Sequence, residues 1–395
     1  MPLKLLPGDI IHGLLSAPSI LVRQPSEAVT AASSLGSAAA EVSWKWEEGA
    51  FSPDHTEIAF CSKVSPYIKR FALSDMSQFP QPGNLPTSAC TDIAYSPDGN
   101  VIAISHISAP FVTRYTRSTM AKLPDFVTGV GAQANAVCFT KDGRYLVLGL
   151  EVSPFIAIYD LITGDRLATP STVPNGGVDW LEPSPDGRFI AVSCGSSVNQ
   201  YVYKTADWSA ILLGAALNGA LKKAKWNSTG SKLAQSTSST PYLRIWDVSG
   251  EAFALNTTAV APVPCPGGGL AWLDDRTLVV QTDTDYRYFD ITSNSWSYAF
   301  AGYYPSTADL GLLLFPGGAR RKFAGTVKDG LGNPLVRKIV ANDRGSGRIL
   351  GKTISSAADG TFTLNVWSNL PAIVYAVGDG GETTELFDSV VAVSI

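Results

Sequence analysis

Histidine is the scarcest titratable residue in this chain of 395 residues, which contains only His12, His55 and His106. No HExxH, paired CxxC or GxSxG motif is present. Metal sites and familiar hydrolytic nucleophiles need such residues to converge, so the sequence predicts no catalytic residue, no metal site and no cofactor. We expect His55 to lie in a turn, and the other two to be ordinary strand residues.

Cysteine and long apolar runs are also sparse. The five cysteines are odd in number and widely spaced, which indicates buried, reduced thiols in a protein that folds in the cytosol. The apolar start of the chain is interrupted by Pro7, Asp9 and Pro18, so we expect no signal peptide. No uninterrupted apolar run approaches about 18 residues, and we therefore expect no membrane insertion.

Charge is low and slightly negative. Charged residues make up 16% of the chain, and the net charge is −4. Nucleic acid binding needs a clustered basic surface, and one short run, "ARRK" at 319–322, does not supply it, so nucleic acid is not an expected partner. What the chain has in quantity is hydrophobic residues, at 45%, and 36 glycines, a profile typical of a turn-rich β protein.

A repeat of about 44 residues dominates the first 318 residues. Each unit has a turn, often "SPDG" or "KDG", between two apolar runs. In four units a proline follows twelve residues after the turn anchor, before an alternating run such as "FIAIYD". The turn anchors are Asp54, Asp98, Asp142, Asp186, Thr229 and Asp275, at intervals of 44, 44, 44, 43 and 46 residues. We interpret each aspartate as a residue that supports its own turn. Four short strands per unit indicate the blades of a β-propeller.

The two ends of this region complete a seventh unit. "LGLLLFPGG" at 310–318 resembles the start of a unit, and residues 9–24 supply further strands. We therefore predict seven blades in residues 1–318, closed by pairing of the head with the tail. Residues 3–9 also resemble a first hairpin, so either they or 311–318 supply the innermost strand of the closing blade.

The repeats resemble those of WD-repeat and related "SPDG" propellers, with "IWD" at 245–247 and "IYD" at 158–160 as degenerate signatures. The resemblance implies the propeller fold and leaves function open, because this fold serves scaffolds, lactonases and other proteins. The Gly-His pair that is usual in the eukaryotic WD repeat is missing from these units. Trp226 and Trp272 occupy a recurrent aromatic position three residues before the turn anchor, and we expect them to pack between blades.

The repeat stops near residue 319. Strand-like runs then alternate with the turns "DGLGNP", "RGSG", "AADG" and "GDGG", which predicts a small antiparallel β-sandwich over 319–395. The segment resembles the prealbumin-like, carboxypeptidase-regulatory-like sandwich. Within that group, "TISSAADGTFTLNV" and the final "YAVGDGGETTELFDSVVAVSI" look most like C-terminal modules of tailed-bacteriophage tail and baseplate proteins. The overall fold class is therefore all-β.

Several aromatic residues fall outside the repeat register. Because aromatic rings suit sugar faces and protein partners, we interpret them as possible partner or glycan contacts. The residues are Trp44, Trp46, Tyr303, Tyr304 and Trp367, with Trp208 and Trp296 sharing the same feature.

These patterns favour a non-enzymatic structural component of a tailed-phage virion, folded in the host cytoplasm. The expected partners are other tail proteins, in an oligomeric particle, and a host-surface glycan or protein. Two alternatives stay open: a cytoplasmic propeller scaffold for protein partners, and a propeller enzyme of lactonase or glycosidase type. The enzyme would gather carboxylates or metal ligands at the central mouth, where the repeat-aligned positions show mainly apolar residues.

Overall fold

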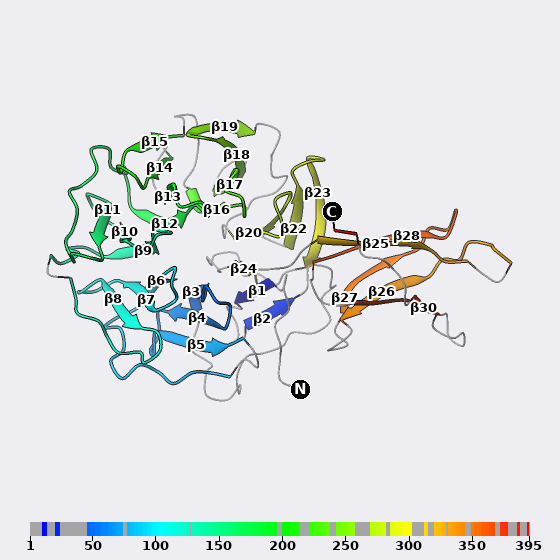
Figure 1. Cartoon of the computed structure of the whole chain (residues 1–395), viewed down its shortest axis with the longest axis horizontal. Helices are drawn as coiled ribbons and strands as arrows, with labels where there is room; N and C mark the ends of the chain where they lie inside the picture. The colour runs from blue at the N-terminus through cyan, green and yellow to red at the C-terminus, as the bar shows by residue number, and fades with distance from the viewer. Residues whose placement is uncertain are drawn as a thin grey trace.

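The computed structural model consists of β-strands and connections, without helices in the described residues (Figure 1). It describes residues 10–13, 20–23, 46–73, 77–126, 128–195, 200–213, 221–237, 242–256, 269–281, 285–301, 312–314, 320–328, 331–343, 349–367, 372–377, 385–387 and 393–394. Short antiparallel sheets follow one another along the chain and surround a common centre, as blades do in a propeller. The all-β prediction is confirmed.

Blades 1 to 3 are three-stranded sheets. Their strands are β3 (Trp46–Phe51), β4 (Glu57–Ser62) and β5 (Ile68–Ala72); β6 (Cys90–Tyr95), β7 (Val101–His106) and β8 (Val112–Thr116); and β9 (Ala134–Phe139), β10 (Tyr145–Leu150) and β11 (Ile156–Asp160). The fourth strand expected in each is reduced to one bridge, such as Tyr115 with Lys122. Nearby prolines, including Pro80, Pro82 and Pro124, lack the N–H that a longer ladder needs.

Blades 4 to 6 have the expected four strands. They are β12 (Val178–Pro183), β13 (Phe189–Cys194), β14 (Tyr201–Lys204) and β15 (Ala210–Leu212); β16 (Leu221–Trp226), β17 (Lys232–Thr237), β18 (Leu243–Ser249) and β19 (Ala252–Asn256); and β20 (Leu270–Trp272), β21 (Thr277–Gln281), β22 (Asp285–Asp290) and β23 (Ser295–Ala301). Each sheet is antiparallel and keeps the chain order, so neighbouring strands form simple hairpins.

The first strand of each blade is the innermost, because these strands contact one another in sequence from β3 to β20. A further sheet joins the two ends of the region: β24 (Leu312–Leu314) pairs with β1 (Ile10–Gly13), which pairs with β2 (Ile20–Arg23). The predicted pairing of head with tail is therefore present. β24 contacts β20 and so takes the inner position, while residues 3–9, the competing segment, lie outside the described residues.

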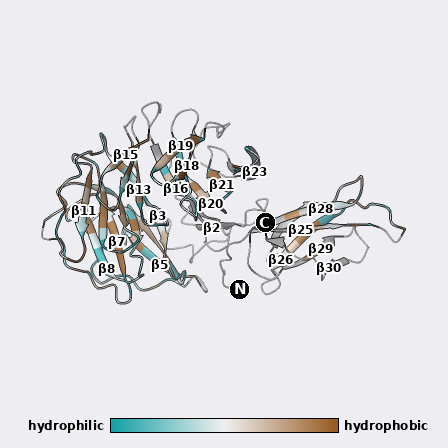
Figure 2. Cartoon of the chain, turned by 45° about the horizontal axis from the view of Figure 1, so that its top comes forward, coloured by the Kyte–Doolittle hydropathy of each residue, from teal (hydrophilic) through white to brown (hydrophobic). Residues whose placement is uncertain are grey.

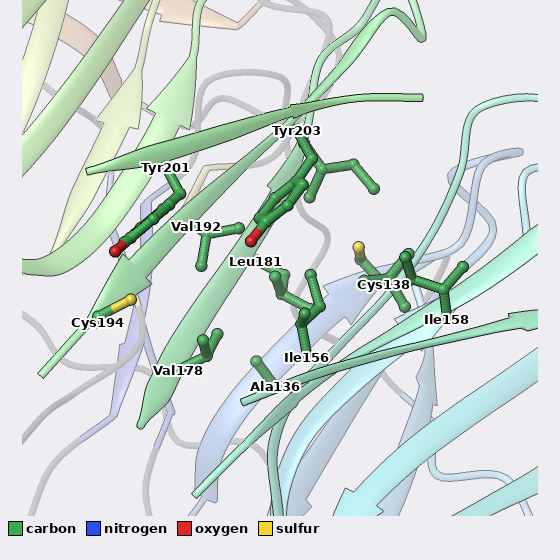
Figure 3. Packing of buried hydrophobic residues seen from close by; sticks show 12 residues of the cluster. Ala136, Cys138, Ile156, Ile158, Val178, Leu181, Val192, Cys194, Tyr201 and Tyr203 are labelled. Atoms are coloured by element: carbon green, nitrogen blue, oxygen red, sulfur yellow. The ribbon is translucent and has the colours of Figure 1, made fainter. Parts of the chain in front are cut away.

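The hydrophobic core lies between blades. Residues of one strand face the preceding blade and the following blade alternately, so each interface has its own cluster of buried side chains. The interface of blades 3 and 4 contains Ile156, Ile158, Val192 and Tyr203 (Figure 3). Figure 2 shows the hydrophobic residues mostly on the strands. This arrangement explains why the apolar runs are nearly continuous and do not follow a simple alternation.

The repeated aspartates support their own turns, as predicted. In blade 3, the Thr140 hydroxyl donates to Asp142 Oδ1 at 2.6 Å, and the Arg144 N–H donates to the same oxygen at 3.1 Å. Blade 6 differs from the predicted alignment by one residue. Asp274 accepts the N–H groups of the turn there, whereas Asp275 accepts hydrogen bonds from blade 5.

The recurrent aromatic position joins adjacent blades, as expected. Trp226 is buried, and its indole N–H donates to the Glu182 carbonyl of blade 4 at 3.0 Å. Trp272 donates in the same way to the Lys225 carbonyl of blade 5 at 2.9 Å. Each tryptophan therefore connects two blades through its indole N–H, and its ring packs between them.

The C-terminal part contains two further sheets, β28-β25-β31 and β27-β26-β29-β30. Their strands are β25 (Arg320–Thr326), β26 (Lys338–Asp343), β27 (Ile349–Ile354), β28 (Thr361–Trp367), β29 (Ala372–Val377), β30 (Glu385–Phe387) and β31 (Val393–Ser394). The "AADG" turn before β28 needs its glycine, because Gly360 has a φ of 74° and a side chain there would meet the Val327 carbonyl.

Four of the cysteines, Cys61, Cys90, Cys138 and Cys194, are free and buried, in agreement with reduced thiols; Cys265 lies outside the described residues. Burial raises the pKa of Cys90 and of Cys194 to about 12, so these thiols stay protonated. In the described part of the chain, no helix is long and apolar enough to cross a membrane.

Candidate functional site: the polar mouth of the ring

A cavity of about 310 Å³ lies where the innermost strands begin. It is lined by residues of blades 1 to 5, among them Glu48, Asp92, Asn135, Asp179 and Lys223, together with Lys63 and Ile107 from connections between second and third strands. We call the side of the ring that carries these connections the mouth face. The opposite side carries the Asp-Gly turns, and we call it the turn face.

An ion pair crosses the mouth. Glu48 of β3 and Lys223 of β16 are 175 residues apart in the chain, and the Lys223 ammonium donates to Glu48 Oε1. Both residues are buried, with 9% and 7% of their surfaces exposed. A buried charge without a partner is costly, so each residue compensates the other. The pair connects blade 1 directly to blade 5.

Trp180 forms one wall beside this pair. The Lys223 and Lys225 ammonium groups lie 4.5 and 4.8 Å from the centre of its ring. The Trp180 indole N–H donates to the Ala224 carbonyl at 3.0 Å, and Lys225 is paired with Glu182 at 2.9 Å. The tryptophan is therefore already engaged by two cations and a backbone group, which makes it a support for the lysines.

Asp92 of β6 is an acid of the mouth whose pKa is strongly raised. Burial raises its pKa to about 7, and the nearby Glu48 charge acts in the same direction. Its carboxylate accepts the N–H of Ile93 at 2.8 Å and that of Val137 at 2.9 Å, which opposes the increase. Because Val137 belongs to blade 3, Asp92 links that blade to blade 2.

The rim of the mouth consists of smaller polar groups that bond across blades. The Thr91 hydroxyl donates to the Ala134 carbonyl at 2.7 Å. The Asn135 amide donates to Glu151 at 2.7 Å and to Asp179 at 3.4 Å. These contacts connect blades 2, 3 and 4 in turn and give the rim a dense set of planar polar groups.

The mouth corrects one expectation from the sequence, because the repeat-aligned residues that line it are mostly polar or charged and not mainly apolar. Glu48 and Asp92 are 44 residues apart, as are Asn135 and Asp179, so the repeat period itself could have identified both pairs. The contact of Lys223 with Glu48 had no such signal, since it depends on closure of the ring.

Among the described residues that line the mouth, no nucleophile is paired with a base. Its buried charges are compensated by each other or by backbone N–H groups, an arrangement that suits holding blades together and binding polar ligands. Within the described residues, no group of three His, Cys, Asp or Glu side chains could hold a metal ion.

The histidines behave as expected where the structure describes them. His106 is fully buried, its Nε2 lies 3.0 Å from the Thr113 hydroxyl, and burial lowers its pKa. His55 lies in an exposed turn with a φ of 53°. His12 is placed only as a backbone position of β1.

The role of the aromatic residues that were predicted as contacts stays a prediction. Trp46 begins β3 and Trp367 ends β28, and only their backbone positions are described. Trp44, Tyr303 and Tyr304 lie outside the described residues. Of the other two, Trp208 packs against Tyr145 with ring centres 5.4 Å apart, and Trp296 packs against Phe289 at 4.7 Å, so both are partly used within the fold.

A second charged cluster lies on the turn face between blades 1 and 2. Buried Glu57 accepts from Arg70 at 3.0 and 2.6 Å and from the Tyr95 hydroxyl at 2.6 Å. Arg117 pairs with Asp54 at 2.8 Å and holds the pKa of that carboxyl well below its usual range. The cluster is self-compensated and borders a groove of about 710 Å³.

Comparison with known proteins gives the fold. No family model and no curated protein matches the chain. Among solved structures, the Cps50 (Swd1) β-propeller domain of Myceliophteria thermophila is 10% identical with a TM-score of 0.57, covering 82% of this chain and 96% of that one. Hydrazine synthase of Kuenenia stuttgartiensis is 13% identical with a TM-score of 0.50, covering 62% and 76%. At such identities the similarity concerns architecture alone, and the chain contains a β-propeller.

Proposed function

We propose that the chain is a non-enzymatic structural component of a tailed-phage virion. Residues 1–318 would form a seven-bladed propeller, counting the sheet of β24, β1 and β2 as a blade beside the six consecutive ones. Residues 319–395 would form a sandwich from the two C-terminal sheets. The virion role itself rests on the resemblance of that terminal segment to tail and baseplate modules.

The exposed apolar side chains of the mouth face carry the assembly role. Val64, Ile107 and Val152 have 40%, 42% and 53% of their surfaces exposed. They lie in corresponding connections of blades 1, 2 and 3, next to the polar mouth. An apolar strip beside a polar centre is typical of protein interfaces, and we propose that a neighbouring tail protein covers it.

The state of the charges favours binding over catalysis. Glu48 and Lys223 neutralise each other, and Asp92 is held by two backbone N–H groups. A glycosidase or lactonase would need an acid or base free to meet its substrate. The mouth therefore fits a polar contact that fixes the orientation of a partner.

Two measurements test this proposal. Mass spectrometry of purified particles should detect peptides of the chain at a fixed ratio to other tail proteins. Particles assembled without the chain should then take up added wild-type protein, but not the triple variant Val64→Asp/Ile107→Asp/Val152→Asp. The matched control is Ile162→Asp, which changes a 79% exposed residue of the turn face and should leave uptake unchanged.

The outcomes separate the alternatives. Absence of the peptides from particles would reject the virion role. If the wild type instead forms a defined complex with a host protein, and the triple variant does not, the cytoplasmic scaffold is the better description. Equal uptake of the triple variant and the wild type would reject the mouth face as the assembly surface.

A further inference from the structure

Four buried positions at the interface of blades 3 and 4, two contributed by each blade, have counterparts one repeat later at the interface of blades 4 and 5. At the interface of blades 3 and 4, they are occupied by Gly149, Ile156, Val192 and Tyr201. At the interface of blades 4 and 5, the corresponding residues, 43 or 44 positions later, are Ser193, Gln200, Gln235 and Arg244. The repeat thus changes from mostly apolar side chains to four polar ones at one interface.

All four side chains face the cluster between blades 4 and 5. Gln235 and Arg244 are cross-strand partners in β17 and β18, two residues from the clustered Leu233 and Trp246 respectively. Ser193 of β13 and Gln200, directly before β14, stand two residues from Ala191 and Val202 of the same cluster. Since side chains in strands alternate, each pair points the same way as its clustered neighbours.

These polar groups are deeply buried. Gln200 is 1% exposed and Arg244 is 3% exposed, while Ser193 and Gln235 have no exposed surface. They stand where their strands meet the connections between second and third strands, so the cluster is at the mouth-face end of the interface. Towards the turn face, the same interface becomes apolar around Phe189 and Trp226.

Their hydrogen-bonding capacity is largely unused. Among the described residues, Gln235 accepts from the Trp246 indole at 2.7 Å, but its Nε2 has no partner. Both amide atoms of Gln200, the Ser193 hydroxyl and Arg244 Nη1 also lack one. Burial lowers the pKa of the Arg244 guanidinium, as expected where a cation loses its hydration.

The donors define the ligand that would satisfy them. A guanidinium supplies one positive charge and a planar fork, which matches a carboxylate. The two carboxamide NH₂ groups and the hydroxyl add neutral donors. A single cation in a low-dielectric site is neutralised by a monoanion, whereas a phosphate dianion would leave an excess buried charge.

We propose that the mouth-face end of the interface between blades 4 and 5 is a binding site for a small carboxylate, held by Arg244 and oriented by Gln200, Gln235 and Ser193. The site is separate from the central mouth and independent of the proposed virion role. Occupation would join the two blades through a bound anion at an interface where all four of these positions are polar.

The experiment uses the full chain with sodium formate as the probe and sodium chloride at equal ionic strength as the reference. Ligands that bind only the folded state raise the thermal midpoint, and at ten times the dissociation constant we expect a rise of about 2–4 °C for the wild type. Arg244→Met should lose this rise. Because the substitution removes an unpaired buried charge, the variant should fold and should melt no lower than the wild type in chloride.

Arg144→Met is the matched control, since it removes a half-exposed arginine of the turn face and should retain the full response to formate. Broadening of the carbon-13 signal of labelled formate gives a second readout, which should be present with the wild type and absent with Arg244→Met. Equal formate responses in the wild type and Arg244→Met, or no response in the wild type, would overturn the site.

Discussion

The interface of blades 3 and 4 and the interface of blades 4 and 5 share one backbone plan but differ in what they bury. Between blades 3 and 4, aliphatic and aromatic side chains fill the space from Val178 to Tyr203 (Figure 3). Between blades 4 and 5, apolar packing around Trp226 gives way to Gln200, Gln235 and Arg244 towards the mouth face.

The comparison shows that the repeat fixes position but not chemistry. Equivalent residues of successive blades occupy equivalent sites in the ring. A residue of one blade can therefore be compared directly with the residue at the same position of the next blade. A polar residue at a site that is apolar elsewhere costs free energy unless something compensates it. Such departures are therefore more informative about function than the average properties of the chain.

The largest effect should come from the apolar half of the second interface. Trp226→Ala removes a buried ring that stacks on Phe189 at 6.1 Å and donates to Glu182. We expect a loss of about 3–5 kcal/mol in the free energy of unfolding, measured with urea. The exposed control Ile162→Ala should change stability by less than about 0.5 kcal/mol. A small effect of Trp226→Ala would mean that this interface is not packed like its neighbour.

The next effect concerns the ion pair that crosses the mouth between blades 1 and 5. Lys223→Met leaves Glu48 buried without its cation and should cost about 3 kcal/mol. The double variant Glu48→Gln/Lys223→Met should recover part of this loss, because no unpaired charge remains. Urea unfolding of the two single variants and the double variant gives the coupling energy, and additive losses would contradict a direct pair.

Exchanging residues between the two interfaces tests the comparison directly. Ile156→Gln places an amide in the apolar interface and should cost about 2–4 kcal/mol. Gln200→Ile restores the apolar residue of the repeat and should stabilise the chain by about 1 kcal/mol in chloride. Both changes are followed by urea unfolding. If Gln200→Ile destabilises the chain as much as Ile156→Gln does, Gln200 has a protein partner and the two interfaces are equally satisfied.

A further effect is a pH dependence at the interface of blades 2 and 3. The pKa of Asp92 is about 7 in the folded chain, above its ordinary value of 3.8, so folding favours the protonated form. The stability that this proton contributes is fully present below pH 4 and is lost as pH rises through 7, by at most about 1.4 kcal/mol per pH unit. Between pH 5 and 8, urea unfolding should show a larger loss for the wild type than for Asp92→Asn. Parallel curves would contradict the raised pKa.

Much of the fold was readable in the sequence because it repeats. The turn aspartates, the tryptophans before them and the pairing of head with tail all follow from a period near 44 residues. The single-residue shift from Asp275 to Asp274 shows the limit of such alignment, since only the actual N–H groups decide which carboxylate supports a turn.

The sequence by itself determined the strands, their turns and the order of the blades, because these depend on contacts within one unit or between consecutive units. The tertiary structure alone decided what the ring brings together. Glu48 meets Lys223 across 175 residues, and Gln200 and Arg244 become buried only when blade 4 packs on blade 5. The sequence does not distinguish a charged or amide side chain in water from one in a core. Only the packing of the blades removes the water around it, and the loss of that water sets its energetic cost.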